Sequence, residues 1–234
     1  MNTWKVKARK TLAQDVFELK IERPPGMSFK AGQYISIVIP GAGPGGRNLR
    51  RAYSIASTPE WDDIELCVKL VDGGPGTSYL NSLHAGMEFQ GQAPFGDFCL
   101  EHDQNLPCLF IGTGTGLAPL RSMVLSDEWT SKAPVGFLLG VRSEQDIIYP
   151  ELFTNDRPAA LRDQEHVRIC LSRPTDSNWS GFKGRVTDYM RQMDWDFMKS
   201  HYYLCGSGAM IAEVKEFLTA KGVLKEQIHT EKYF

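Results

Sequence analysis

Two patterns of hydrophobic and polar positions divide the chain near residue 102. Before that point, short runs alternate apolar and polar residues, and clusters of Gly, Pro and Asp separate them. Alternation with a period of two is typical of half-buried strands, and regular turn signals between such runs indicate an antiparallel barrel or sandwich. The predicted strands lie at residues 4–10, 15–22, 33–40, 51–57, 63–71 and 87–92.

After residue 102, compact apolar runs alternate with segments of helical period. The apolar runs lie at residues 108–114, 135–141, 167–172 and 202–207, and the helix-like segments follow them at 118–129, 147–153, 185–193 and 209–222. This alternation predicts a parallel sheet with crossover helices. The polar segment 101–107 ends in Pro and is the expected boundary. Residues 1–102 and 103–234 are therefore predicted to be separate domains.

Charge balance and cysteine spacing argue against several classes of function. The chain has 234 residues, with 26 Lys and Arg against 28 Asp and Glu. That balance gives nucleic-acid binding no electrostatic support. The five cysteines are dispersed without CxxC spacing, which argues against a disulfide framework, a metal site or an iron–sulfur cluster. No signal peptide or membrane span is recognisable, so we expect a cytoplasmic protein without a membrane partner.

Glycine-rich turns follow two of the apolar runs in the second half. Residues 110–119 place Thr113, Gly114, Thr115 and Gly116 between a predicted strand and a helix. Such a turn lets the backbone approach a pyrophosphate, although a tight turn without a ligand explains this motif equally well. A second glycine-rich strand end occupies residues 203–210. Because ligands of open α/β sheets bind beyond the carboxyl ends of the strands, we expect both turns to line one crevice.

One predicted strand of the first half carries a cation, an aromatic ring and a hydroxyl. Arg51 and Tyr53 project from the same face, where they can hold a phosphate and stack on a flat ring. The alternative is an exposed strand with a solvated Arg. Residues 73–80 then lead into a short helix that Thr77 or Ser78 can cap, and its free N–H groups suit a diphosphate.

The order and spacing of four motifs resemble the ferredoxin–NADP(+) reductase superfamily over essentially the whole chain. The motifs are Arg51-x-Tyr53-Ser54, Gly76-Thr77-Ser78-x-Leu80, Gly114-x-Gly116-x-x-Pro119 and Cys205-Gly206. The resemblance implies a two-domain fold, in which a six-stranded antiparallel Greek-key β-barrel binds flavin and a following five-stranded parallel α/β domain binds NAD(P). It implies FAD and NADP(H) as cofactors and no metal. Hydride would pass from NADPH to the flavin, and single electrons would pass on to ferredoxin or flavodoxin.

The resemblance also implies roles for individual residues. The catalytic group would be Ser54, Cys205, Glu231 and Tyr233. The FAD contacts would be Arg51, Ala52, Tyr53, Ser54, Val68, Lys69, Gly76, Thr77, Ser78, Thr115, Tyr233 and Phe234. The NADP contacts would be Thr113, Gly114, Thr115, Gly116, Arg142, Ser172, Arg173, Lys183, Arg185, Cys205, Gly206 and Met210. Tyr233, with Phe234 as an extension, would cover the flavin face and move aside for the nicotinamide.

The nucleotide preference depends on the cations that follow the second and third parallel strands. Arginine is the usual partner of a 2′-phosphate, so the cations Arg142, Arg173, Lys183 and Arg185 favour NADPH over NADH, unless they are merely solvated. Arg47, Arg50 and Arg121 are candidates for a basic rim that receives an acidic electron carrier.

Three other functions remain open at this point. They are a stand-alone reductase component of an oxygenase, an NAD(P)H:flavin reductase, and a nucleotide-binding module without redox activity. The expected protein is a monomeric ferredoxin/flavodoxin–NADP(+) reductase-type enzyme.

Overall fold

Six antiparallel strands build the first half of the chain, as the alternating pattern predicts. The structure is a computed structural model that describes residues 1–100, 106–129, 133–162 and 164–233. Its first six strands are β1 (Asn2–Ala13), β2 (Val16–Glu22), β3 (Tyr34–Ile39), β4 (Leu49–Ser54), β5 (Asp63–Lys69) and β6 (Glu88–Phe95). They pair in the order β4-β3-β6-β1-β2-β5.

The first sheet closes into a barrel at the seam between its outermost strands. An antiparallel bridge between Ile55 and Leu66 joins the end of β4 to β5. Alternate side chains point inward, so that Trp4 and Val6 of β1 are buried while their neighbours are exposed. The short helix α1 (Pro75–Asn81) lies beside β3, β4 and β5.

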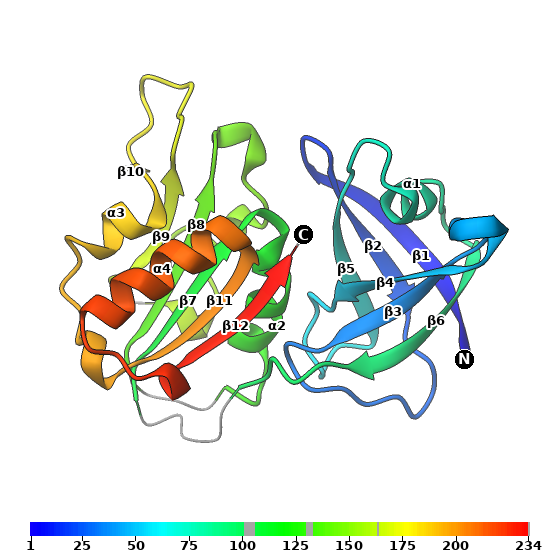
Figure 1. The fold of residues 1–234 in the computed structure, drawn as a ribbon, viewed down its shortest axis with the longest axis horizontal. Coiled ribbons are helices and arrows are strands. Elements are labelled where there is room, and N and C mark those ends of the chain that lie inside the picture. Colours follow the sequence, from blue (N-terminus) through cyan, green and yellow to red (C-terminus); the bar gives the residue numbers. More distant parts are fainter. Residues whose placement is uncertain (101–105, 130–132, 163, 234) are drawn as a thin grey trace.

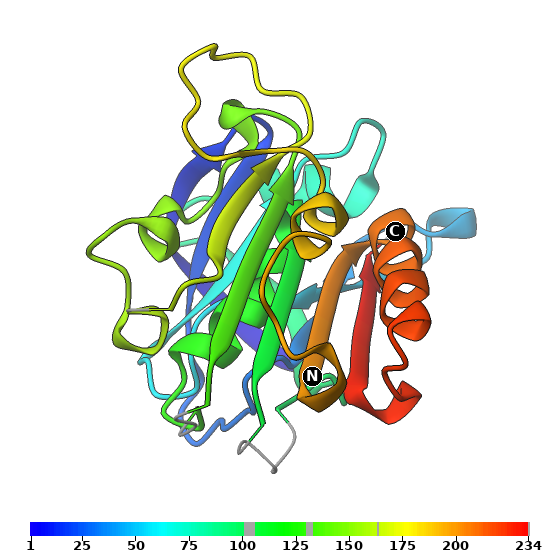
Figure 2. The same ribbon diagram turned by 90° about the vertical axis from the view of Figure 1, so that its left-hand side faces the viewer.

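The second half forms a parallel sheet covered on both faces (Figures 1 and 2). Its strands are β7 (Cys108–Thr113), β8 (Val135–Val141), β9 (Val167–Leu171), β10 (Phe182–Lys183), β11 (His201–Ser207) and β12 (Ile228–Tyr233), in the order β10-β9-β8-β7-β11-β12. The helices are α2 (Leu117–Leu125), α3 (Val186–Met190) and α4 (Gly208–Ala220). α3 and α4 share one apolar cluster on one face of this sheet.

The opposite face of the parallel sheet packs against the barrel through α2. A single apolar cluster there combines α2 and strand residues such as Phe110 and Tyr203 with barrel residues such as Ala56 and Phe98. Burying one continuous apolar surface between the domains is the condition for a fixed relative orientation. Figure 1 shows β12 at the edge of the parallel sheet, with its end directed toward the barrel.

The second domain differs from its prediction in two places. The parallel sheet has six strands rather than five, because the two residues of β10 pair with β9. A run this short carries no periodic signal. Residues 147–153, predicted to be helix-like, contain only a short 3₁₀ turn at Pro150–Phe153, preceded by Tyr149 in the left-handed conformation with φ 48°. Residues 101–105 lie outside the described part, so the domain boundary near residue 102 stays a prediction.

Candidate cofactor and active site

The two glycine-rich strand ends lie side by side, as expected from the sequence. Thr113 at the end of β7 accepts a hydrogen bond on Oγ1 from the Ser207 N–H at 2.9 Å. A Cβ added at Gly116 would overlap the carbonyl oxygen of Cys205, and one added at Gly206, whose φ is +131°, would overlap Thr113. Glycine is required here because the two turns approach each other backbone to backbone.

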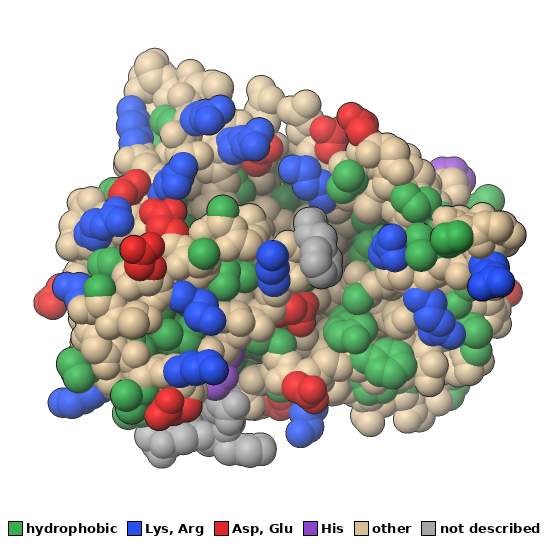
Figure 3. All heavy atoms as spheres, in the orientation of Figure 1, with side chains coloured by type: hydrophobic (Ala, Val, Ile, Leu, Met, Phe, Trp, Pro, Cys, Tyr) green, Lys and Arg blue, Asp and Glu red, His purple; other side chains and the backbone are tan. Residues whose placement is uncertain are grey.

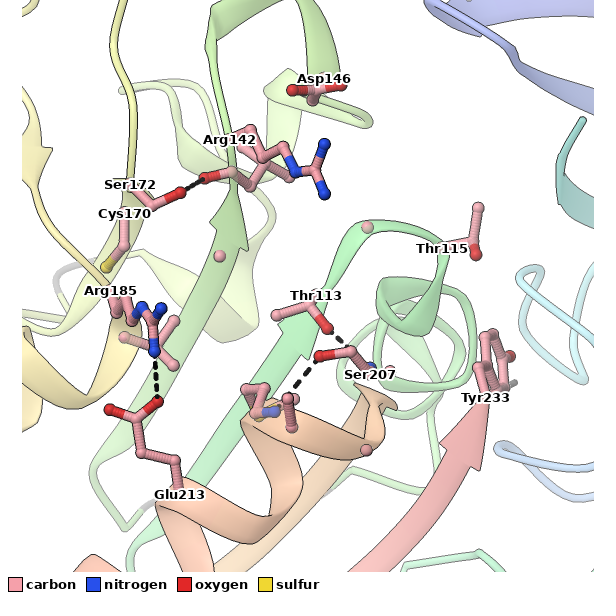
Figure 4. Close-up of a pocket in the computed structure, with 18 of the residues that line it drawn as sticks. Thr113, Thr115, Arg142, Asp146, Cys170, Ser172, Arg185, Ser207, Glu213 and Tyr233 are labelled. Atoms are coloured by element: carbon pink, nitrogen blue, oxygen red, sulfur yellow. Dashed lines mark hydrogen bonds and ion pairs between the residues drawn. The ribbon is translucent and has the colours of Figure 1, made fainter. Parts of the chain in front are cut away.

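A cavity of about 1050 Å³ opens at this edge of the sheet (Figure 4). Of the residues predicted for cofactor binding, it is lined by Lys69, Thr113, Gly114, Thr115, Arg142, Ser172, Arg185, Gly206, Met210 and Tyr233. Lys69 comes from the barrel and the others from the α/β domain. The cavity therefore spans the two domains at the carboxyl ends of the parallel strands, where an open α/β sheet binds its ligands.

The two ends of the cavity differ in chemistry. Figure 4 shows Tyr233 and Thr115 at one end, and Arg142 and Arg185 toward the other. A second cavity of about 380 Å³ shares Arg142, Ser172 and Arg185 with the first, and adds Arg173 and the carboxylate of Asp188. Three guanidinium groups therefore border adjoining cavities, as an anionic phosphate would require.

A hydrogen-bonded chain starts at Tyr233, at the aromatic end of the cavity, and crosses the domain boundary. The Tyr233 hydroxyl donates to Ser54 Oγ at 2.6 Å, and Ser54 Oγ donates to Glu231 Oε1 at 2.7 Å. Cys205 pairs with Glu231 in the register of β11 and β12 and is fully buried. The structure thus brings together the four residues predicted to be catalytic, from β4, β11 and β12.

Burial controls the protonation of this group. It raises the pKa of the Glu231 carboxyl above its ordinary value, an effect that the hydrogen bond from Ser54 opposes. Burial likewise raises the pKa of the Cys205 thiol and of the Tyr233 phenol well above their ordinary values, and the charge of Glu231 adds to both shifts. Cys205 and Tyr233 are therefore neutral at pH 7. Burial moves the pKa of Glu231 toward neutral pH, whereas it moves the pKa values of the other two groups away from it.

The barrel presents an open surface beside this chain. β4 leaves Arg50, Arg51 and Ala52 exposed, and Tyr53 is half-buried next to them. A Cβ at Gly76 would lie 2.7 Å from the Tyr53 hydroxyl and 3.1 Å from Arg51 Cγ, so α1 starts directly against these side chains. An aromatic ring, a guanidinium and a close backbone N–H fit the flat ring and pyrophosphate of a flavin dinucleotide.

Comparisons with known proteins agree with this arrangement. The family model of the oxidoreductase FAD-binding domain matches residues 3–99, and that of the oxidoreductase NAD-binding domain matches residues 110–216. Ferredoxin–NADP reductase B of Sorangium cellulosum is 35% identical over 239 residues, which cover 97% of this chain and 95% of that protein. The chain belongs to the ferredoxin–NADP(+) reductase superfamily. It is an oxidoreductase with an FAD-binding and an NAD(P)-binding domain.

Other relatives show the breadth of this superfamily. The reductase component of propane 2-monooxygenase from Gordonia is 31% identical over 242 residues, covering 99% of this chain and 67% of that protein. Among solved structures, the Amycolatopsis cytochrome P450 reductase GcoB has a TM-score of 0.83 and 30% identity, over 98% of this chain and 68% of that one. A ferredoxin NADP+ reductase from Neisseria gonorrhoeae shares the fold, with a TM-score of 0.84 and 20% identity over 100% and 98%.

The structure corrects one prediction at the predicted FAD site and places three of its residues. The cap predicted at Thr77 or Ser78 is wrong, because the N-cap is Gly74, three residues before Thr77, and α1 begins at Pro75. Thr77 Oγ1 instead accepts from the Val71 N–H at 3.1 Å and closes the preceding loop. Ser78 is exposed. The Val68 side chain is buried in the barrel core, which leaves only its backbone for a cofactor.

Four further candidates are placed as follows. Gly116 and Cys205 are buried and are not among the residues that line the cavity, so their contact with NADP stays a prediction. Lys183 is exposed on β10 and lines neither cavity. Phe234 lies outside the described residues.

The predicted basic rim is wrong for one of its three members. Arg47 and Arg50 are exposed on the barrel, but Arg121 is buried between the domains with 7% of its surface exposed. It forms an ion pair of 2.9 Å with Glu65. On the face that Figure 3 shows, Lys and Arg side chains lie on both domains. Docking of a carrier at Arg47 and Arg50 stays a prediction.

Sequence reasoning missed several residues that line the cavity. Glu213 on α4 pairs with Arg185 at 3.1 Å, and Thr187 donates to the same carboxylate. Lys232 lies over Gly208 at the start of α4, since a Cβ there would lie 2.5 Å from its Cε. These residues carry no local motif. Only the position of Glu213 two turns after the second glycine-rich turn could have drawn attention to it.

Among the described residues, no helix has the length and apolar character needed to cross a membrane.

Proposed function

We propose that this protein is a ferredoxin- or flavodoxin–NADP(+) reductase that takes hydride from NADPH and passes single electrons to a small carrier protein. The observation that carries the choice of NADPH is the set of three arginines, Arg142, Arg173 and Arg185, around the adjoining cavities. A nicotinamide dinucleotide placed with its 2′-phosphate among them would direct its other end toward Tyr233 and Ser54. The Sorangium relative, named as a ferredoxin–NADP reductase, supports the same choice.

FAD, when bound, would supply the chemistry that accepts a hydride and releases its two electrons one at a time. Tyr53 would contact the flavin ring, and Arg51 would pair with a phosphate. Gly76, in the first turn of α1, has no side chain, so its backbone can approach the cofactor. The main contribution of the protein is then orientation, because hydride transfer depends on the distance and alignment of the two rings.

The chain of hydroxyls at Ser54 and Tyr233 would hold protons at defined positions. Tyr233 donates to Ser54, and Ser54 donates to Glu231, so the carboxylate orients both hydroxyls in one direction. Tyr233 also lines the aromatic end of the cavity, where its ring would exclude water until the nicotinamide displaced it.

The test is an anaerobic visible spectrum of the purified protein, titrated with NADPH and separately with NADH. A bound-flavin spectrum that NADPH bleaches at lower concentration than NADH is the expected result. No bound flavin, with NAD(P)H oxidised only after flavin is added, would contradict the proposal and make the protein a flavin reductase.

A second candidate function is the reductase component of an oxygenase. It is favoured by the relatives from Gordonia and Amycolatopsis, at 31% and 30% identity. Bleaching by NADH alone would select it. Reduction of a carrier or oxygenase encoded beside this chain, and not of a general ferredoxin or flavodoxin, would select it as well.

A further inference from the structure

Helix α2 fastens the α/β domain to the barrel through polar contacts on one side. Arg121 NH1 donates to the Ala56 carbonyl oxygen at 2.7 Å and to Glu65 Oε2 at 2.9 Å. One residue on, Ser122 Oγ donates to the Ser57 carbonyl oxygen at 2.6 Å. All of these groups are buried. The two bonds from the Arg121 guanidinium are charge-assisted, and the bond from Ser122 has a main-chain acceptor. These bonds therefore fix the geometry between α2 and the barrel.

The acceptors of these bonds form the seam of the barrel. Ala56 N–H donates to the Glu65 carbonyl oxygen at 2.8 Å, and Glu65 N–H donates to Ser57 Oγ at 3.1 Å. The Ile55–Leu66 bridge lies directly beside them. Arg121 therefore binds the barrel two residues beyond Ser54, where β4 leaves the flavin-facing surface.

A second side chain of the α/β domain supports the arginine from the other side. The Arg121 guanidinium lies 4.3 Å from the centre of the Tyr149 ring. The Tyr149 hydroxyl donates to Glu18 Oε2 at 2.8 Å. Two buried carboxylates of the barrel, Glu18 and Glu65, are thus each held by one buried side chain of the other domain. The Arg121–Glu65 ion pair tolerates little displacement, because moving either partner leaves a buried charge uncompensated.

The same helix begins at the glycine-rich turn. Gly116 immediately precedes α2, and Thr113, Gly114 and Thr115 line the nucleotide cavity. A continuous path of covalent and hydrogen-bonded contacts therefore runs from that turn along α2 to Arg121, across to Ala56, and back to Ser54 and Tyr53 on β4. It connects the two surfaces proposed to hold the nicotinamide and the flavin.

We propose that Arg121 is a positioning residue for hydride transfer, which sets the distance between the two cofactor sites through its contacts with Glu65 and Ala56. This inference rests on the proposed hydride transfer from a nicotinamide nucleotide to FAD. Arg121 touches neither cavity, so it acts through the relative placement of the domains and not through contact with a substrate.

The test compares variants of the flavin-loaded protein by anaerobic stopped-flow reduction. The main variant combines R121M with E65Q, because removing both charges leaves neither one buried alone. R121K and Y149F are the milder variants. The control is K7Q with D63N, an ion pair of 2.8 Å on the outer surface of the barrel. For each protein, the rate of flavin bleaching at saturating nucleotide, the nucleotide Kd and the thermal midpoint are measured.

A misplacement of about 1 Å can slow a positioned reaction by ~10²-fold, so we expect R121M with E65Q to reduce its flavin ~10- to 100-fold more slowly. The Kd should change by less than about threefold, since a loss confined to the transition state appears in the rate at saturation. R121K should recover part of the rate, Y149F should lose a smaller part, and the control should match the wild type.

A lower thermal midpoint with an unchanged rate at saturation, in the double variant or in both milder variants, would overturn the proposal and leave Arg121 a purely structural residue. If the double variant does not fold, R121K and Y149F decide the outcome by the same criterion. Failure of the proposed function is recognised separately, because the wild-type protein itself would then show no flavin bleaching by NADPH. Bleaching by NADH would leave this inference testable with that nucleotide.

Discussion

The Tyr233 hydroxyl donates a hydrogen bond of 2.6 Å to Ser54 Oγ, and so connects the end of β12 to the end of β4 across the two domains. Both residues come from segments that sequence patterns place far apart, in the last strand and in the fourth. Tyr233 lines the aromatic end of the cavity, and Ser54 lies behind it on the barrel side. Under the proposed function, a nicotinamide ring that reached Ser54 would have to break this bond.

Removing the Tyr233 ring should therefore raise the affinity for nucleotide. We expect Y233A to bind NADPH several-fold more tightly, because no aromatic contact has to be displaced, and to shift the visible spectrum of the bound flavin. Difference-spectrum titration with NADP(+) measures both. Y233F, which keeps the ring and loses the hydroxyl, separates the ring from the hydrogen bond. If neither the Kd nor the spectrum changed in Y233A, the ring would not cover the flavin.

The cation at the far end of the cavity should decide the choice of nucleotide. R185A should weaken NADPH binding by ~10-fold or more, as expected for a lost charge-assisted contact, and should affect NADH much less. The Kd of each nucleotide from flavin bleaching tests this. R162A is the matched control, because Arg162 is exposed on the same domain and lines neither cavity. Equal losses for both nucleotides would contradict a 2′-phosphate site at Arg185.

The carboxylate partner of Tyr149 should make stability depend on pH. Burial, with the nearby Glu65 charge, raises the pKa of Glu18 above its ordinary value. The folded state then holds the proton more tightly than the unfolded state, so stability falls as pH rises from the ordinary value through the raised one. E18Q should remove this slope and melt higher than the wild type at pH 7 to 8.

Thermal melts of E18Q and wild type between about pH 4 and pH 8 measure that difference. E151Q, on the exposed Glu151, is the control and should run parallel to the wild type. A wild-type midpoint that did not fall relative to E18Q as pH rose would show that the Glu18 carboxylate is not penalised by burial.

The contact between the two glycine-rich turns should be sensitive to a single methyl group. G116A places a Cβ on the Cys205 carbonyl oxygen, and neither backbone can yield easily. We expect a loss of about 1–3 kcal/mol in the free energy of unfolding, the range of overpacking in a rigid site. Denaturant unfolding measures it. G208A is the control, because its Cβ meets only the flexible end of Lys232. Similar losses in both variants would count against a close contact at Gly116.

Much of the fold could be predicted because its signals are local. Alternating runs identified the six strands of the barrel, and glycine-rich turns after apolar runs identified the edge of the sheet that carries the cavity. Two elements had no such signal. β10 is a pair of residues recognised only by its partner strand, and Tyr149 begins its 3₁₀ turn in a left-handed conformation that residue preferences disfavour.

The site was predicted unevenly for a similar reason. Residues within a motif, such as Ser54 and Thr113, lie where the pattern places them. Arg121 was misjudged as a surface cation because its buried partners, Ala56 and Glu65, belong to the other domain and appear only when the chain is folded. Charge in a helical segment does not show whether that face meets solvent or another domain.

The barrel seam at Ile55 and Leu66 has a consequence for how such proteins can be recombined. Arg121, which binds this seam, belongs to the second half of the chain. A chimera of two relatives, joined at the linker, would therefore take the residue at position 65 from one parent and α2 with the residue at position 121 from the other. Such a hybrid would keep every cofactor motif and could still lack the ion pair between its two domains. Exchanging the halves should preserve this ion pair only between parents that share both Glu65 and Arg121.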